Sequence, residues 1–247
     1  MLHSVSPAFD GLLFPEHTSA SFLERVLHFY RGRGFKFLSL SEALSRLHDQ
    51  KSLDDAIVFT FDDGYRNNLT CVLPLFARYR CPFTVFVTTD MVERKASYWW
   101  AGLQEVLKRV DVIEYQPMGC RISARTLSEK RVAYARISHN VRDGASHPED
   151  VLALMSRYAV DGGCLLDRDA LNKEELRKLS ADPLVTIGGH TRTHCALSQA
   201  PLNVAREEIV SNRRYLEDVV QKQVNHFAYP FGDERSCGPR EYSLVRE

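Results

Sequence analysis

The sequence predicts an α/β fold in which parallel strands alternate with helices, arranged in layers or as a barrel. Two segments, 56–61 and 82–88, are almost continuously apolar and rich in β-branched and aromatic residues, which is typical of strands buried on both faces. The stretch 65–79 between them has a helical pattern, which Pro74 is expected to bend or split. Strand–helix–strand order favours parallel pairing, because the crossover helix returns the chain to the same end of the sheet.

The elements before these strands follow the same alternation. A helix is predicted over 18–31, with Thr18 or Ser19 as its cap. A short strand over 35–40 and a small helix over 42–48 come next. The 247 residues, 44% of them hydrophobic, suit one domain with a sizeable core, two small domains being the alternative.

The alternation stops in the middle of the chain. From about residue 91 to residue 180 we expect a helical insert without intervening strands, with helical stretches near 100–110, 126–142, 147–158 and 172–179. A strand at 184–187, a helix at about 201–222 and a strand at 225–229 then restore the pattern. Residues 233–247 show no further strand, so a barrel built from these elements would stay open.

The composition excludes some classes of partner. Lys and Arg (32) balance Asp and Glu (32), which leaves no electrostatic footprint for nucleic acid or an anionic membrane. Six cysteines without C-x-x-C spacing favour reduced thiols over a disulfide framework. No signal peptide or membrane-spanning apolar run is seen, which predicts a cytoplasmic protein. Residues 1–7 resemble the tail of a strand, so the true N-terminus stays open.

Two short motifs carry the chemistry. Asp62 and Asp63 directly follow the strand 56–61, and His190 and His194 follow the strand 184–187 through two glycines. Asp-Asp-Gly also forms plain turns, and an H-x-x-x-H pair is often two solvated histidines. Their shared position at strand ends, where parallel α/β proteins place functional loops, favours a site. One Asp and two His suit an open metal site that activates water, with the second Asp as base.

Three segments together resemble a known family. Thr60–Gly64, His190–His194 and Phe227–Gly232 are similar to the ordered signatures of polysaccharide deacetylases, carbohydrate esterase family 4. The resemblance implies a distorted (β/α) barrel of parallel strands, here incomplete at both ends. It also implies one catalytic domain over 1–247, with the helical insert at about 91–180.

The resemblance implies a metal-dependent hydrolase that removes N-acetyl groups from N-acetylated sugars of a polysaccharide or glycan precursor, such as a bacterial surface glycan. Zn²⁺ is the expected cation, with Co²⁺, Ni²⁺ and Fe²⁺ as alternatives. Asp63, His190 and His194 are implied to bind the metal, and Asp62 to act as the general base. Thr191 is implied to support the histidine loop, His190–His194. The implied substrate-binding residues are Tyr229, Pro230, Phe231 and Gly232. The backbone N–H of Phe231 is the expected oxyanion donor.

The chain departs from the family pattern at two places. Many relatives carry an arginine in the third motif where this chain has Ala228, and no late histidine motif follows Gly232. Other branches have a Tyr-His pair on the first strand, to which Leu2-His3 is similar. His3 is therefore the candidate general acid, a disordered terminal histidine being the alternative.

Two other functions stay open. The same metal ligands would serve a small-molecule amide hydrolase, and the departures would also suit a catalytically impaired glycan-binding or scaffold protein from a truncated gene. The aromatic run Tyr98-Trp99-Trp100 would either stack on sugar rings or pack in a core. The sequence makes no prediction of oligomeric state.

Overall fold

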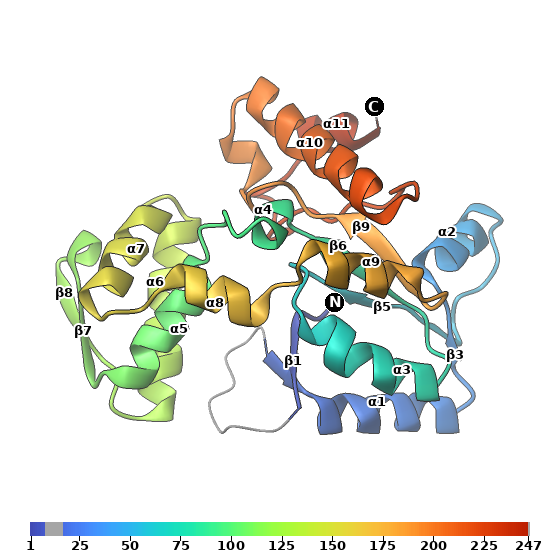
Figure 1. Cartoon of the computed structure of the whole chain (residues 1–247), viewed down its shortest axis with the longest axis horizontal. Coiled ribbons are helices and arrows are strands. Elements are labelled where there is room, and N and C mark those ends of the chain that lie inside the picture. The colour runs from blue at the N-terminus through green and yellow to red at the C-terminus, as the bar shows by residue number, and fades with distance from the viewer. Residues whose placement is uncertain (8–16, 247) are drawn as a thin grey trace. The chain divides into compact units, whose positions relative to one another are not determined.

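The computed structural model describes residues 1–7 and 17–246 (Figure 1). The chain forms two compact units, which we describe separately. The sheet unit comprises residues 1–93 and 169–247, and the helical unit comprises residues 94–168. The assignment of 1–247 to one catalytic domain stays a prediction.

A parallel array of strands organises the sheet unit. β5 (Phe59–Phe61), β6 (Phe83–Val87) and β9 (Val185–Gly189) form one parallel sheet in the order β5-β6-β9. Single parallel bridges extend this array at both edges, from Leu2 to Phe61 and from Gly189 to Phe227. The carboxyl ends of these segments therefore meet at the same edge, where parallel α/β sheets bind ligands.

Two further pairs of short strands are also parallel. β1 (Ser4–Ser6) pairs with β2 (His17–Ser19), and β3 (Lys36–Phe37) pairs with β4 (Ala56–Ile57). The prediction of an α/β fold with parallel strands is confirmed. The barrel is not confirmed, because no closed sheet forms within residues 1–7 and 17–246.

Most helices of the sheet unit follow the predicted order with altered ends, and two short helices, Thr89–Val92 and Pro239–Arg246, were not predicted. The helices are α1 (Ala20–Gly32), α2 (Leu40–His48), α3 (Leu73–Arg78), α4 (Thr89–Val92), α9 (Lys173–Ala181), α10 (Leu202–Val220) and α11 (Pro239–Arg246), with a short 3₁₀ turn at Leu197–Gln199. Ser19 caps α1 by accepting a hydrogen bond from Phe22 N at 3.2 Å. Pro74 splits the predicted helix 65–79: a π-helical turn, Asn68–Val72, precedes α3, and Pro74 lies in the first turn of α3, where a missing N–H costs little.

Aromatic side chains form the centre of the core of the sheet unit. Phe76 of α3 makes edge-to-face contacts with Phe59, Phe61 and Phe83, with ring centroids 5.1–5.6 Å apart. Burying each such ring contributes roughly 1.5–3 kcal/mol. α9 and α10 pack against β9 and against each other, so one helix pair supports the strand that leads to the histidines.

The helical unit contains a strand pair that the sequence did not predict. Its helices are α5 (Trp99–Arg109), α6 (Leu127–Arg142), α7 (Pro148–Arg157) and most of α8 (Gly162–Asp169). An antiparallel hairpin joins β7 (Val112–Tyr115) to β8 (Cys120–Ser123), through a 3₁₀ turn, Gln116–Met118, and Gly119 at φ +58°. The expectation of an insert without strands was wrong here, because four-residue strands give too short an alternating pattern to recognise.

The aromatic run packs inside the helical unit. Tyr98, Trp99 and Trp100 are all buried, and Trp100 makes edge-to-face contacts with the other two. Gly102 permits close packing nearby, since a Cβ there would lie 2.1 Å from Met155 Sδ. These contacts favour core packing over sugar stacking. Among the described residues, no helix has both the length and the apolar character needed to cross a bilayer.

Candidate metal centre

Three side chains from two strand ends converge in the sheet unit. Asp63 follows β5, and His190 and His194 follow β9. Asp63 Oδ1 lies 3.6 Å from His190 Nε2 and 3.3 Å from His194 Nε2. One ligand atom from each residue lies within 4.8 Å of the others. Bonds of roughly 2.0–2.2 Å to a single cation would place oxygen and nitrogen ligands at about this spacing.

The burial of this group fits a divalent cation. Asp63 and His190 are each only 2% exposed, and Asp63 Oδ1 makes no conventional hydrogen bond to the described residues. A buried carboxylate oxygen is costly without a compensating positive charge. Carboxylate and imidazole donors suit Zn²⁺ and similar ions, so the residues present fit a metal.

Charge coupling within the group is strong. Burial alone would raise the pKa of Asp63, but the imidazoles of His194 and His190 outweigh it and hold this pKa well below its ordinary value. Burial would lower the pKa of His190, but Asp63 and Asp62 outweigh it and raise this pKa. The group therefore carries an ionised carboxylate, the protonation state that a metal ligand needs.

Asp62 lies beside the group in a different environment. It is 6% exposed, and its Oδ1 has no hydrogen-bond partner in the described part of the chain. Burial raises the pKa of Asp62, and the neighbouring Asp63 adds to the increase, while His190 opposes it. The two adjacent carboxyl groups therefore differ in their affinity for a proton.

The N-terminal segment brings His3 next to the first motif. Leu2 N donates to Thr60 O at 2.8 Å, and Asp62 N donates to Leu2 O at 2.9 Å. This register puts His3 beside Asp62 on neighbouring parallel segments. The charge of His3 acts on both aspartates and lowers the pKa of each. His3 is half-buried.

The histidine loop is held by its own backbone and side chains. His190 Nδ1 lies 2.8 Å from the carbonyl oxygen of Ala228. Because a carbonyl only accepts, Nδ1 carries a proton, which leaves Nε2 as the nitrogen that would bind a cation. Thr191 Oγ1 accepts a hydrogen bond from His194 N at 3.0 Å. Thr191 and His194 have φ angles of +59° and +65°, a left-handed conformation that non-glycine residues adopt only where the surroundings impose it.

The third motif contributes unequally to the site. The Phe231 ring lies 4.9 Å from the His194 ring, centroid to centroid, and Phe231 also has a left-handed φ of +65°. Tyr229 instead contacts Phe227 and Tyr242 of α11, and burial raises its pKa to about 12. Pro230 is buried and Gly232 is exposed. Of the four residues predicted to bind substrate, Phe231 therefore lies at the metal site, because its ring contacts His194, a predicted metal ligand.

The family of the chain follows from comparison with known proteins. A sequence model described as polysaccharide deacetylase matches residues 49–237, more than half of the chain. The chain belongs to the polysaccharide deacetylase family. It is thus a hydrolase that acts on carbon–nitrogen bonds other than peptide bonds, as the three motifs predicted.

Solved structures with a similar fold are distant from this chain in sequence. The Streptococcus pyogenes deacetylase PplD in complex with acetate is 14% identical, with a TM-score of 0.62. IcaB from Ammonifex degensii is 16% identical, with a TM-score of 0.60. Each alignment covers 99% of this chain and 76% of the other. At this identity the likeness shows the fold alone, and a comparison with curated proteins finds no match.

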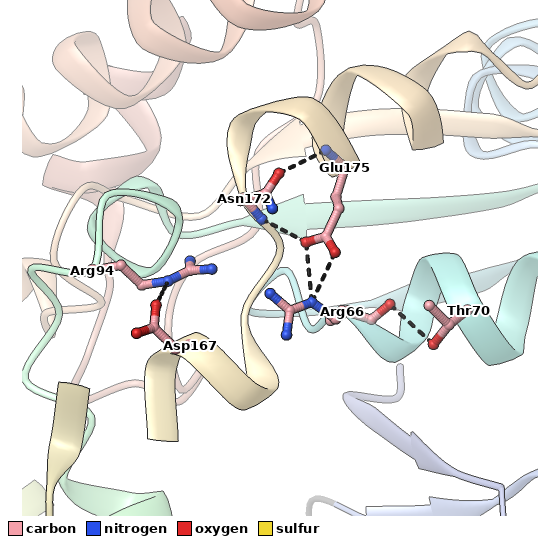
Figure 2. A network of polar contacts seen from close by, with 6 residues as sticks. All are labelled: Arg66, Thr70, Arg94, Asp167, Asn172 and Glu175. Atoms are coloured by element: carbon pink, nitrogen blue, oxygen red, sulfur yellow. Dashed lines mark hydrogen bonds and ion pairs between the residues drawn. The ribbon is translucent and has the colours of Figure 1, made fainter. Parts of the chain in front are cut away.

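A polar network anchors the loop after the first motif of this polysaccharide deacetylase (Figure 2). Tyr65 pairs antiparallel with Ala170, and Leu171 N donates to Gly64 O at 3.1 Å. Arg66 Nε contacts both carboxylate oxygens of Glu175, at 2.9 and 3.1 Å. Asn172 and Glu175 also form the capping box of α9. The turn that follows Asp63 is thereby tied to the start of a helix.

In the helical unit, Figure 2 shows a separate ion pair between Arg94 and Asp167, 2.8 Å long.

The sequence did not predict two residues that support the histidine loop of this family member. Glu208 and Asn212 of α10 are almost completely buried. Glu208 Oε2 accepts a hydrogen bond from Thr193 N at 2.8 Å, and Asn212 Oδ1 accepts one from His190 N at 3.2 Å. A signal was available: both occupy the helical stripe that otherwise carries the buried residues Ala205, Ile209, Leu216 and Val219. Polar residues at core positions need internal partners.

Proposed function

We propose that this chain is a metal-dependent N-deacetylase that removes acetyl groups from N-acetylated sugars of a polysaccharide or glycan precursor. The buried group of Asp63, His190 and His194 is the observation that carries the proposal. Zn²⁺ is the proposed cation, because carboxylate and imidazole ligands suit it, and Co²⁺, Ni²⁺ and Fe²⁺ are alternatives. Such an ion would supply Lewis-acid activation of water and of the acetamide carbonyl.

Asp62 is the proposed general base. It neighbours the ligand Asp63, and its Oδ1 accepts no hydrogen bond from the described residues, so its carboxylate stays available for proton transfer. It is buried, which raises its pKa toward the range in which a base works well. The positive charge of a bound cation would still favour its ionised form. Asp62 would therefore accept the proton of the attacking water.

His3 is the proposed general acid. The departing sugar amine needs a proton, and the parallel bridge between Leu2 and Phe61 puts His3 beside the proposed base. Its imidazole would deliver that proton from the N-terminal side of the array.

The third motif is proposed to face the substrate. Phe231 packs edge-on against His194, and its backbone N–H is the proposed donor to the tetrahedral oxyanion. Tyr229, Pro230 and Gly232 would line the remaining part of the sugar groove. Thr191 would support the reaction indirectly through its hydrogen bond to His194 N.

An acetate-release assay tests the proposal. The full chain would be treated with a chelator, dialysed, and assayed on N-acetylhexosamine oligomers after addition of Zn²⁺, Co²⁺, Ni²⁺ or Fe²⁺. We expect no acetate without metal and restored release with at least one ion. Release that is unaffected by chelation would overturn metal dependence. Release from small amides but not from sugars would favour the small-molecule hydrolase instead.

Sugar binding needs a separate measurement. Saturable binding of an oligomer without acetate release under any of the four ions would favour the catalytically impaired alternative.

A further inference from the structure

Asn212 is a buried polar residue whose amide contacts lead to the backbone of the proposed metal site. Its side chain is 0% exposed, in the middle of α10. A buried amide is costly unless its hydrogen bonds are made. Asn212 Oδ1 accepts from His190 N at 3.2 Å, and Nδ2 donates to Val87 O at 2.9 Å and to Thr191 O at 2.6 Å.

These partners define the orientation of the amide. The two carbonyl oxygens can only accept and the His190 N–H can only donate, so exchanging Oδ1 and Nδ2 would break the three hydrogen bonds to these backbone groups. The amide therefore joins the carboxyl end of β6, at Val87 O, to the backbone N–H of His190 and the carbonyl oxygen of Thr191.

The end of β6 is also joined to Asp63. Thr88 N donates to Asp63 O at 3.4 Å, and Thr88 Oγ1 donates to His190 O at 3.0 Å. β6 lies between β5, which precedes Asp63, and β9, which precedes His190. A displacement of the β9 end relative to β6 would therefore change the separation of the two predicted ligands.

Gly189 indicates how closely the Asn212 side chain packs against the backbone that precedes His190. A Cβ at Gly189 would lie 2.6 Å from Asn212 Oδ1, too close for any real contact. Thr191, on the other side of His190, has a left-handed φ of +59°, which is unfavourable for a β-branched residue. The loop thus needs outside contacts to keep its conformation, and Asn212 makes one at His190 N and one at Thr191 O.

We propose that Asn212 is a positioning residue that sets the geometry of the Asp63, His190 and His194 ligands by joining the ends of β6 and β9. The inference rests on the proposed function, since it concerns the cation site on which that function depends. The Asn212 side chain is assigned no contact with the cation, because its amide acts only through the backbone.

The test compares two variants of the full chain. Asn212→Leu removes these three hydrogen bonds and a longer one from Nδ2 to Thr89 Oγ1 at 3.5 Å, while keeping a buried side chain of similar size. Leu216→Ala is the matched control, since Leu216 is fully buried one turn further along the same helix, in the main core of the sheet unit. Each protein would be measured for Zn²⁺ affinity by chelator competition, for the visible spectrum of bound Co²⁺, which depends on ligand geometry, and for the Tm of the metal-free form.

We expect Asn212→Leu to bind Zn²⁺ about tenfold more weakly or worse and to change the Co²⁺ spectrum, as loss of a group that orients a ligand does. Leu216→Ala should keep the wild-type affinity and spectrum even if its Tm falls as far. An Asn212→Leu protein with affinity within about threefold of wild type and an unchanged spectrum would overturn the inference.

A second variant is used if Asn212→Leu does not fold. If circular dichroism shows that Asn212→Leu is unfolded, Asn212→Asp decides by the same two measurements, because it keeps the acceptor and loses the donor. Gly189→Ala should give the same spectral change. A wild-type chain that binds neither Zn²⁺ nor Co²⁺ would overturn the proposed function and this inference together, whereas wild-type binding with unaffected variants would overturn this inference alone.

Discussion

The predicted metal-ligand side of the site and its predicted proton-transfer side are built differently. On the ligand side, β6, the third motif and α10 all hold the histidine loop, through Thr88, Ala228 O, Glu208 and Asn212. On the proton-transfer side, His3 lies on a short segment whose backbone pairs with Thr60 and Asp62. Asn68 Nδ2 donates to His3 O at 3.2 Å, and Asn67 Oδ1 accepts from Val5 N at 3.1 Å. Cation binding should therefore be separable from turnover.

Loss of a ligand should have the largest effect. Asp63→Ala removes the carboxylate and leaves His190 and His194 without their ionic partner, so we expect Zn²⁺ affinity to fall by about 100-fold or more, with no measurable acetate release. Metal content after dialysis and acetate release would both be measured. A variant that retained one bound Zn²⁺ per chain would show that the ligands have been assigned wrongly.

Removal of the proposed base should affect turnover alone. Asp62→Asn keeps the size of the side chain and removes its basicity, so we expect kcat to fall by about 10²–10⁴-fold. Zn²⁺ affinity should stay close to wild type, because Asp62 lies outside the ligand group. Loss of bound metal in this variant would contradict the division between the two sides.

Removal of the proposed acid should have a smaller effect. His3→Gln keeps a polar side chain on the N-terminal segment, and we expect kcat to fall by about 10–100-fold with the metal content unchanged. The effect should shrink for a substrate with a better leaving group, which needs less protonation. Equal kcat values for His3→Gln and wild type would assign the proton donor elsewhere.

Acid should weaken metal binding gradually. In the metal-free protein the pKa of His190 is raised above its ordinary value of 6.5, so below the raised pKa a cation must displace a proton. Zn²⁺ affinity should then decrease by about tenfold per pH unit for each displaced proton. Asp63 adds no competition there, because its pKa is well below its ordinary value. Isothermal titration between about pH 5.5 and 8.5 would check this, and an affinity independent of pH would argue against His190 as a ligand.

Much of the fold near the site could be predicted from local pattern. The apolar segments 56–61, 82–88 and 184–187 contain the strands β4 and β5, β6 and most of β9, because burial on both faces requires continuous apolar sequence. The same strand ends carry Asp63 and His190, so their convergence followed from parallel pairing. Whether the sheet closes into a barrel could not be predicted, because pairing between distant segments depends on backbone register, which a single sequence does not show.

The residues that support the site were harder to predict. Glu208 and Asn212 act on backbone N–H and C=O groups, and such partners leave no pattern in the sequence. Only their position on the apolar stripe of α10 distinguishes them from surface residues. The hairpin of the helical unit was missed for another reason: its stability depends on packing within that unit, more than on the propensities of eight residues.

The hydrogen bond between His190 and residue 228 has a consequence for engineering. Because the acceptor is the main-chain carbonyl of Ala228, the imidazole tautomer is independent of the side chain at that position. Residue 228 can therefore be varied, for example to arginine, without removing the acceptor that orients the His190 imidazole. Position 228 is a natural first choice for a mutational library aimed at rate or substrate range.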